Sequence, residues 1–125
     1  MDIWAGFTLN RKEAVYLQLM RRVRQLVAAG KLENGAALPS RRETAAQIEI
    51  NPNTVQKAYK LLEEEGLLAT EGNSGSIIRC TEEIRSTIGS ELMREAGAEF
   101  VRSAKEMRLS YKQVIDLLSE LWEEP

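Results

Sequence analysis

The 125-residue sequence contains no histidine and a single cysteine, Cys80. Without histidine, no Ser-His or Cys-His pair can activate a nucleophile, and no histidine cluster can hold a metal ion. A glycine-rich phosphate loop before a helix is missing as well. One cysteine cannot form an internal disulfide, and Cys80 is interpreted as a packing residue at a strand end. The sequence therefore predicts a protein that is not an enzyme, with no catalytic residues, no metal site and no cofactor.

Long apolar runs are also absent. No stretch approaches the ~20 apolar residues that a membrane-spanning helix needs. The first residues, Met-Asp-Ile-Trp, lack the basic flank and apolar core of a signal peptide. Together with the lone cysteine, these features predict a cytoplasmic protein that does not contact a membrane. A hydrophobic fraction of 43% is ample for a folded core.

Excess positive charge is scarce, since the formal net charge is −2. Its distribution is uneven: residues 1–80 contain 11 Lys and Arg against 9 Asp and Glu, and residues 81–125 contain 6 against 10. The local field of a surface, rather than the total charge, attracts phosphate. Basic residues that could concentrate such a field, some of them ordinary solvated positions, are Arg21, Arg22, Arg24, Arg41, Arg42, Lys57 and Lys60.

Two helix-start signals stand close together in the middle of the chain. In the first, Ser40 precedes Glu43 by three residues, the capping box in which each side chain satisfies the other residue's backbone N–H. In the second, Asn51 is an N-cap acceptor, and Pro52 has the fixed φ of a first helical position. The sequence predicts a short helix after Ser40 and a second helix over 52–65.

The second predicted helix has two chemically different faces. At 100° per residue, its packing face carries Val55, Ala58, Tyr59 and Leu62. Its opposite face carries Asn53, Gln56, Lys57 and Lys60. Amide side chains can pair with adenine edges and lysine with guanine or phosphate, so a helix-turn-helix that reads a DNA major groove is one interpretation. An ordinary solvated face is the other, and this segment alone leaves both open.

The surrounding segments favour the DNA-reading interpretation. Residues 67–70 and 76–79 have the composition of short strands, and 71–75 supplies the turn between them. Helix, turn, helix and hairpin is the element order of a winged helix. A first helix over 12–29 is predicted from apolar residues at helical spacing. These are Tyr16, Leu19, Met20, Val23, Leu26 and Val27.

The segment before this helix, 3–9, is apolar enough to be a short strand or an extended arm on the core. Trp4 and Phe7 are expected to be buried in the monomer, with a subunit contact as the alternative.

These residues resemble the GntR-type bacterial transcription regulators, and among them the small YtrA-like group, over roughly residues 10–80. The Tyr-x-Gln and Gly-x-Leu-x-x-Gly motifs are present as Tyr16, Gln18, Gly30, Leu32 and Gly35. The Leu-Pro-Ser-x-Arg and Asn-Pro-Asn-Thr-Val-x-x-Ala-Tyr motifs are present as Leu38, Pro39, Ser40, Arg42, Asn51 through Val55, Ala58 and Tyr59. The closing Leu-Glu-x-Glu-Gly-Leu motif is present as Leu62, Glu63, Glu65, Gly66 and Leu67.

The resemblance implies contacts of DNA with Ser40, Arg42, Asn53, Thr54 and Lys57. Arg41, Gln56 and Lys60 are added as DNA-binding candidates from the residues themselves, and Gly75 through the backbone of the wing.

Three departures from the family pattern matter. Glu49 occupies a turn position that is often glycine, and its carboxylate faces either solvent or phosphate. The wing tip, 72–76, has no positive charge, and Glu71 adds a negative one, so a weak wing contact is predicted. Ala14 replaces a usual proline, and Asn10 with Glu13 is expected to supply the missing cap.

Residues 81–125 are predicted to form a two-helix tail. Its first helix carries Ile84, Ile88, Leu92, Ala96 and Phe100 at four-residue steps, and Ser110 with Gln113 caps the second. Arg108 lies in the hinge, 107–109, where the family tends to have glycine. Apolar side chains of the second helix include Val114, Ile115, Leu117, Leu118, Leu121 and Trp122.

A segment of this size cannot bury so many large apolar groups alone. The predicted dimer interface comprises Ile88, Leu92, Phe100, Val114, Leu117, Leu118, Leu121 and Trp122, and the family resemblance supports it. The alternative is a hairpin that folds back onto its own winged helix.

The expected fold is mainly α with a small β-hairpin: a winged helix-turn-helix over 1–80, followed by a two-helix C-terminal dimerisation appendage over 81–125. The expected function is a transcription regulator, a repressor, that binds double-stranded operator DNA of near-palindromic sequence as a homodimer. The alternative is a winged-helix module for protein contacts, in which Arg42, Asn53 and Lys57 would be idle. The tail is too small to enclose a drug-sized ligand, which leaves open a small effector at the dimer seam.

Overall fold

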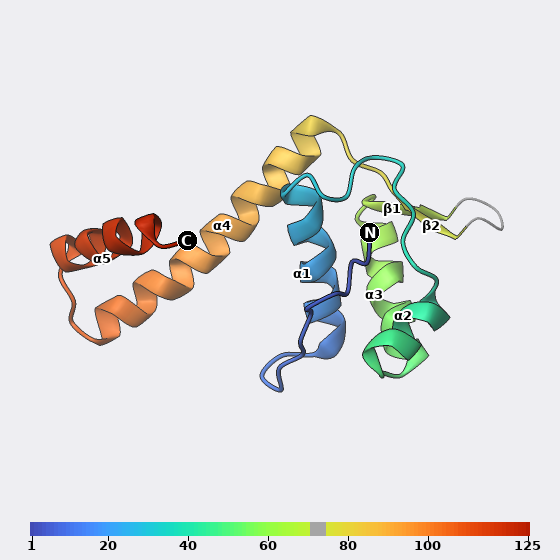
Figure 1. Cartoon of the computed structure of the whole chain (residues 1–125), viewed down its shortest axis with the longest axis horizontal. Helices are drawn as coiled ribbons and strands as arrows, with labels where there is room; N and C mark the ends of the chain where they lie inside the picture. The colour runs from blue at the N-terminus through green and yellow to red at the C-terminus, as the bar shows by residue number, and fades with distance from the viewer. Residues whose placement is uncertain (71–74) are drawn as a thin grey trace. The chain divides into compact units, whose positions relative to one another are not determined.

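The computed structural model describes residues 1–70 and 75–125, and its described elements are helical except for a small antiparallel sheet (Figure 1). The helices are α1 (Val15–Ala28), α2 (Arg41–Ile48), α3 (Pro52–Glu64), α4 (Glu82–Glu106) and α5 (Tyr111–Glu123), and the strands are β1 (Leu68–Thr70) and β2 (Ser76–Ile78). This confirms the predicted fold class and the order helix, turn, helix, hairpin. The chain divides into two compact units, Met1–Gly89 and Ser90–Pro125, with the boundary inside α4.

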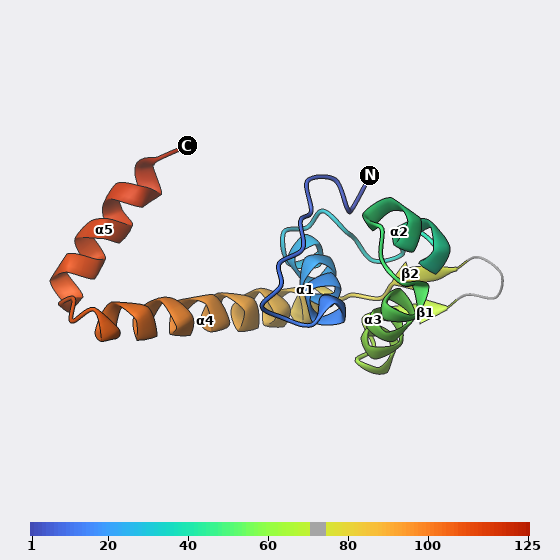
Figure 2. The same cartoon turned by 90° about the horizontal axis from the view of Figure 1, so that it is seen from below.

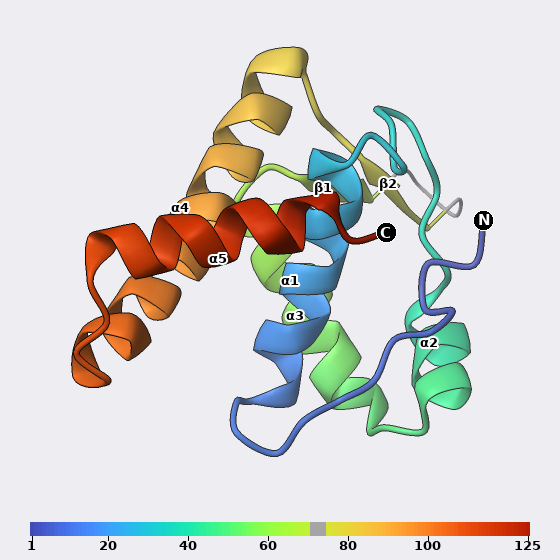
Figure 3. The ribbon, with the colours of Figure 1, turned by 60° about the vertical axis from the view of Figure 1, so that its left-hand side comes forward.

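The first unit has one core, to which every element of the winged helix contributes. Helix α3 packs against α1 and α2, and β1 follows directly from it (Figures 2 and 3). The predicted packing face of α3 is buried. Val55, Ala58 and Leu62 are inaccessible to solvent, and Tyr59 is nearly so. The apolar stripe of α1 is buried too, apart from Tyr16, which is half-buried. Burial of this size is the main force that holds short helices together.

The sheet pairs β1 with β2 in antiparallel register, with Leu68 opposite Ile78 and Thr70 opposite Ser76. The loop before α2 extends this sheet. Gly35 N donates to Ile78 O at 2.7 Å, and Leu38 N donates to Ser76 O at 2.9 Å. The start of α2 is thereby tied to the base of the wing.

The N-terminal segment forms an arm on the core, and no strand is assigned over residues 3–9. Ile3 and Trp4 are buried, and Phe7 is half-buried with its ring centroid 5.3 Å from that of Trp4. The expectation that Trp4 and Phe7 lie in the monomer core is therefore confirmed. Arg22 of α1 fixes the arm by donating from Nε to Ile3 O and from Nη2 to Ala5 O, each at 2.9 Å.

Helix α1 begins at Val15, three residues later than predicted, and its N-cap Ala14 makes no side-chain cap bond. The expected cap by Asn10 and Glu13 is wrong for this helix. Asn10 Oδ1 accepts from the N–H groups of Lys12 and Glu13, which lie in a turn before α1. The Glu13 carboxylate binds the Arg21 guanidinium, which lowers the pKa of Glu13 below its ordinary value. The buried Gln18 side chain instead closes the turn by donating to Asn10 O and Glu13 O.

The second unit comprises the later part of α4 and all of α5. Arg108 takes up a left-handed conformation, with φ of 60°, and ends α4 in a Schellman motif through Arg108 N to Lys105 O and Leu109 N to Ala104 O. Ser110 and Gln113 form the predicted capping box at the start of α5. The predicted hinge therefore exists, although an arginine occupies the position that glycine would fill without strain.

Candidate nucleic-acid interface

The turn between α2 and α3 has the geometry of a helix-turn-helix. Glu49 ends α2 in the left-handed region with φ of 55°, and the N–H of Ile50 donates to Ala45 O at 3.0 Å. Asn51 then caps α3, since its Oδ1 accepts from Asn53 N at 2.8 Å. Both predicted helix starts are confirmed. Glu49 is exposed, and its backbone adopts the strained conformation that explains why glycine suits this position.

The outer face of α3 presents its polar side chains to solvent. Asn53, Gln56, Lys57 and Lys60 are exposed, and Thr54 is half-buried. The structure thus brings the predicted α3 residues together on one side, opposite the buried residues. An exposed row of amide and ammonium groups, held on a rigid helix, is chemically able to donate to base edges and to phosphates.

The start of α2 separates the two adjacent arginines. Arg42 is exposed. Arg41 is half-buried, with its guanidinium carbon 5.4 Å from the Tyr59 ring centroid and its Nη2 3.3 Å from Glu63 Oε1. Arg41 was predicted to bind DNA together with Arg42. In the structure its guanidinium joins α2 to α3, which leaves Arg42 as the freer of the two side chains.

The capping box uses two backbone N–H groups at the start of α2. Ser40 Oγ accepts from Glu43 N at 3.1 Å, and the Glu43 carboxylate accepts from Ser40 N at 3.3 Å. The first N–H groups of a helix have no partner within it. After the box has formed, the N–H groups of Arg41 and Arg42 and the hydroxyl hydrogen of Ser40 are the donors available to an anion here.

Most of the basic candidates outside α2 and α3 serve the fold. Arg21 binds Glu13, Arg24 binds Glu65, and Arg22 holds the arm.

Lys57 Nζ lies 4.0 Å from the centroid of the Tyr16 ring, a cation–π contact from α3 to α1. Within the described ranges, the exposed positive charge of the helix-turn-helix therefore comes from Arg42, Lys57 and Lys60.

A buried hydrogen-bond relay supports the start of α2. Trp4 Nε1 donates to Thr44 Oγ1 at 3.0 Å, Thr44 Oγ1 is 3.0 Å from the Tyr59 hydroxyl, and that hydroxyl donates to Pro39 O at 2.8 Å. Burial raises the pKa of Tyr59 above its ordinary value, so the group stays neutral. Sequence analysis missed this relay. Trp4 and Thr44, which bond to each other, are 40 residues apart, and the polar Thr44 on a packing face was the one available signal.

The wing is described only in part. Gly75 is half-buried with φ of +82°, a conformation that glycine adopts without strain. The predictions for Glu71, Gly72, Asn73 and Ser74 concern residues outside the described ranges.

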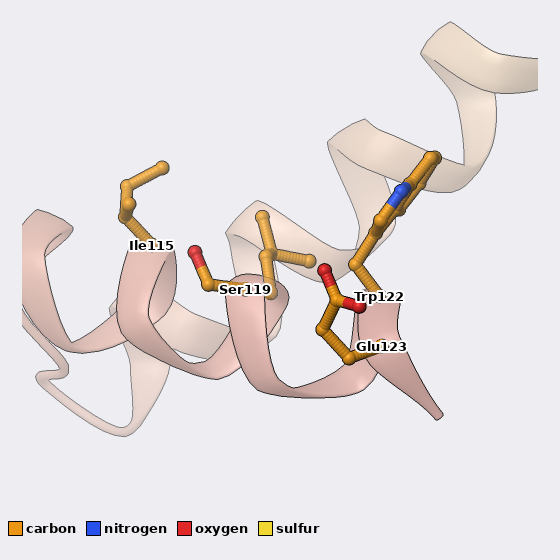
Figure 4. Close-up of a pocket in the computed structure, with 5 residues that line it drawn as sticks. Ile115, Ser119, Trp122 and Glu123 are labelled. Carbon is orange, nitrogen blue, oxygen red and sulfur yellow. The ribbon is translucent and has the colours of Figure 1, made fainter. Parts of the chain in front are cut away.

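The predicted dimer residues fall into two groups. Ile88 packs against the core of the first unit. In the second unit Leu92 and Val114 are half-buried, and Phe100, Leu117, Leu118, Leu121 and Trp122 are exposed. A shallow depression of about 340 Å³ lies along α5, lined by Ile115, Leu118, Ser119, Trp122 and Glu123 (Figure 4). Much of the apolar face of α5 is therefore accessible in the single chain.

Among the described residues, no set of three or more cysteine or carboxylate side chains is arranged to hold a metal ion. In the same ranges, no helix combines the length and apolar character needed to cross a membrane.

Comparison with known proteins gives consistent results. The family model described as "Bacterial regulatory proteins, gntR family" matches residues 15–78. YhcF of Bacillus subtilis, an HTH-type transcriptional regulator, is 32% identical over 102 residues, covering 82% of this chain and 84% of YhcF. The HTH-type transcriptional repressor YtrA of the same organism is 44% identical over 64 residues, which are 51% of this chain and 49% of YtrA.

A similar fold is found in a GntR family transcriptional regulator from Listeria monocytogenes. Its structure matches with a TM-score of 0.80 at 21% identity, covering 90% of this chain and 98% of that one. The match to the family model and the identity with YhcF and YtrA confirm the resemblance to the GntR regulators and to the YtrA-like group.

Proposed function

The chain belongs to the GntR family of bacterial regulatory proteins, transcriptional regulators with a DNA-binding domain, and from this premise we propose that it is an operator-binding repressor that acts as a homodimer. The observation that carries the proposal is the arrangement of α3. Its apolar side is fully buried at Val55 and Leu62, whereas the side that carries the amide and lysine side chains is exposed. An exposed row of this kind at the second helix of a helix-turn-helix is suited to a major groove.

In the proposed complex, α3 lies in the major groove. Asn53, Gln56 and Lys57 face the base edges, where amides can pair with adenine and lysine with guanine. Thr54 and Lys60 contact the flanking phosphates, which position the helix without reading sequence.

Helix α2 lies across the backbone in this arrangement. The N–H groups of Arg41 and Arg42 and the Ser40 hydroxyl point to a phosphate, where the helix dipole adds a favourable field. Arg42 extends from the same point toward base edges. Gly75 contributes a backbone contact from the wing. The wing tip, 72–76, has no positively charged residue, so the contact between wing and DNA is weak and specificity rests on α2 and α3.

The second unit supplies the dimer contact. Leu118 and Leu121 are 44% and 47% exposed, and Trp122 is 87% exposed. Contiguous apolar surface of this kind on a soluble chain marks an interaction site. An isologous contact between two copies would bury this face of α5, together with Phe100 and Leu117, and would present two reading helices about one DNA turn apart. The operator is then near-palindromic, and the working compartment is the cytoplasm.

A small effector could act at this contact. The depression along α5 is shallow in the single chain, so an effector would need walls from both copies.

Selection of bound sequences from random duplex DNA tests the proposal. The full chain is incubated with a random duplex pool, and bound molecules are amplified and sequenced over several rounds. A consensus with two-fold symmetry and half-sites about 10 base pairs apart supports a dimeric reader. Recovery of an asymmetric consensus contradicts the dimer, and recovery of no consensus favours the alternative of a module for protein contacts.

A further inference from the structure

We infer that Trp4 of the N-terminal arm is a positioning residue for DNA binding, which sets the place of the α2 N-terminus through the buried relay to Pro39. The inference rests on the proposed function and deepens it, since it adds the arm to the reading head. None of the residues that the sequence predicts to contact DNA lies in the arm.

The direction of the relay follows from the number of hydrogens. An indole N–H can only donate, and Trp4 gives it to Thr44 Oγ1. The Tyr59 hydroxyl has one hydrogen, which it gives to Pro39 O. The hydrogen between Thr44 and Tyr59 must therefore come from Thr44. Each donor in the series from Trp4 to Pro39 is used once, in one direction, and such aligned bonds strengthen one another.

Water cannot replace a missing member of the relay. The exposed fractions are 3% for Trp4, 0% for Thr44 and 1% for Tyr59. If the indole N–H is removed, the Thr44 oxygen loses its donor in a place that solvent does not reach. A buried oxygen that has lost its donor costs free energy, and neighbouring side chains can reduce that cost by shifting toward it.

The shift is transmitted to the start of α2. Pro39 precedes the N-cap Ser40, whose neighbours supply the donors proposed to hold phosphate. The arm also contacts the other end of this helix, because Gln47 Nε2 donates to the Asp2 carboxylate at 2.7 and 2.8 Å. That bond is the largest cause of the lowered pKa of Asp2. The arm thus holds α2 at Thr44 and Gln47 while Arg22 holds the arm on α1.

Helix α3 carries one member of the relay, Tyr59, but its position depends on the arm far less. It is capped by its own Asn51, and its position on α1 is fixed by the buried side chains Val55, Ala58 and Leu62. A change at Trp4 should therefore alter the contacts made from α2 and leave those made from the outer face of α3 in place. This asymmetry separates positioning from a general loss of stability.

The experiment is a pair of double-mutant cycles with the full chain and its selected duplex. Affinity is measured for Trp4→Phe, Arg42→Ala and Gln56→Ala and for the doubles that combine Trp4→Phe with each. Phenylalanine keeps an aromatic ring at this place and removes the N–H together with the pyrrole part of the indole, so we expect Trp4→Phe to lower affinity by about three- to tenfold. In the Arg42→Ala background this loss should shrink to under about half, because the contact of the Arg42 side chain is already gone and the backbone contacts of the α2 start remain. In the Gln56→Ala background it should persist in full.

An unchanged affinity of Trp4→Phe overturns the inference, as does an equal loss in both backgrounds. If Trp4→Phe is unfolded at the assay temperature, Thr44→Val retains the shape of the side chain and breaks the relay at Thr44, with loss of the bonds to Trp4 and Tyr59. Thr44→Ser, which restores the hydroxyl, must then recover the affinity, and failure to recover it also overturns the inference. Absence of selective binding by the unaltered chain is a different result, since it refutes the proposed function itself.

Discussion

The Lys57 ammonium lies over the ring of Tyr16, with Nζ 4.0 Å from the ring centroid. This contact links the exposed face of α3 to α1, and it uses the tyrosine of a motif that precedes the helix-turn-helix by more than 20 residues. A lysine side chain has high rotamer freedom, which is costly to lose on binding. The ring therefore holds the ammonium in place before any DNA arrives.

The first prediction concerns Tyr16. Replacement by leucine removes the ring face and should weaken binding to the selected duplex by about 0.5–1 kcal/mol, because Lys57 becomes disordered in the free protein. Tyr16→Phe keeps the ring face and should bind almost as the unaltered chain does. Fluorescence anisotropy measures both. Tighter binding by Tyr16→Leu would mean that the ring competes with DNA for Lys57, and it would contradict the view that the ring holds the ammonium in place for binding.

The second prediction contrasts the two arginines at the start of α2. Arg42→Ala should lower operator affinity by about 1–3 kcal/mol, since it removes a base-edge contact, and should leave thermal stability almost unchanged. Arg41→Ala removes the contacts with Tyr59 and Glu63, so its main effect should fall on stability. Quantitative gel shifts and thermal melts on the same preparations separate the two effects. Equal losses of affinity for both variants would show that Arg41 also reads DNA.

The third prediction concerns the strained backbone at Glu49. Glycine adopts a φ of 55° freely, so Glu49→Gly should raise the free energy of unfolding by about 1 kcal/mol. Glu49→Gln is the matched control, because it removes the charge and keeps the strain, and it should give no comparable gain. Urea unfolding monitored by tryptophan fluorescence measures the difference. A gain as large for glutamine as for glycine would assign the effect to charge.

The fourth prediction concerns the exposed face of α5. Leu118→Glu and Leu121→Glu each place a charge in the proposed contact and should give monomers, because an unpaired buried charge is costly. Glu120→Lys changes a charge on the opposite face of the same helix and should leave the dimer intact. Light scattering after size-exclusion chromatography reports the mass of each variant. A dimer that survives both leucine substitutions would refute this use of the tail.

Signals within one or two helical turns predicted the local structure well. The capping boxes at Ser40 and Ser110, the cap at Asn51 and the buried side of α3 all depend on neighbours in sequence. The sequence predicts a start of α1 at residue 12, three residues before the observed start, because the turn over residues 11–13 uses the same polar side chains as a helix cap.

Contacts between distant segments could not be predicted in this way. Nothing near Arg41 in the sequence shows that Glu63 and Tyr59 will hold it, and nothing near Trp4 indicates Thr44. These partners are chosen by how the helices pack, which is a property of the whole core. The helix wheel likewise shows which residues of α3 face outward, but the contact of Lys57 with Tyr16 requires the position of a second helix.

A reader of operator DNA must select one duplex over others, and equilibrium binding of the purified full chain at low ionic strength measures that selectivity. The selected duplex is compared with a scrambled duplex of the same length and composition. The selected duplex should bind at least about 10³-fold more tightly, the lower end for specific readers. Equal affinity for both duplexes would contradict it.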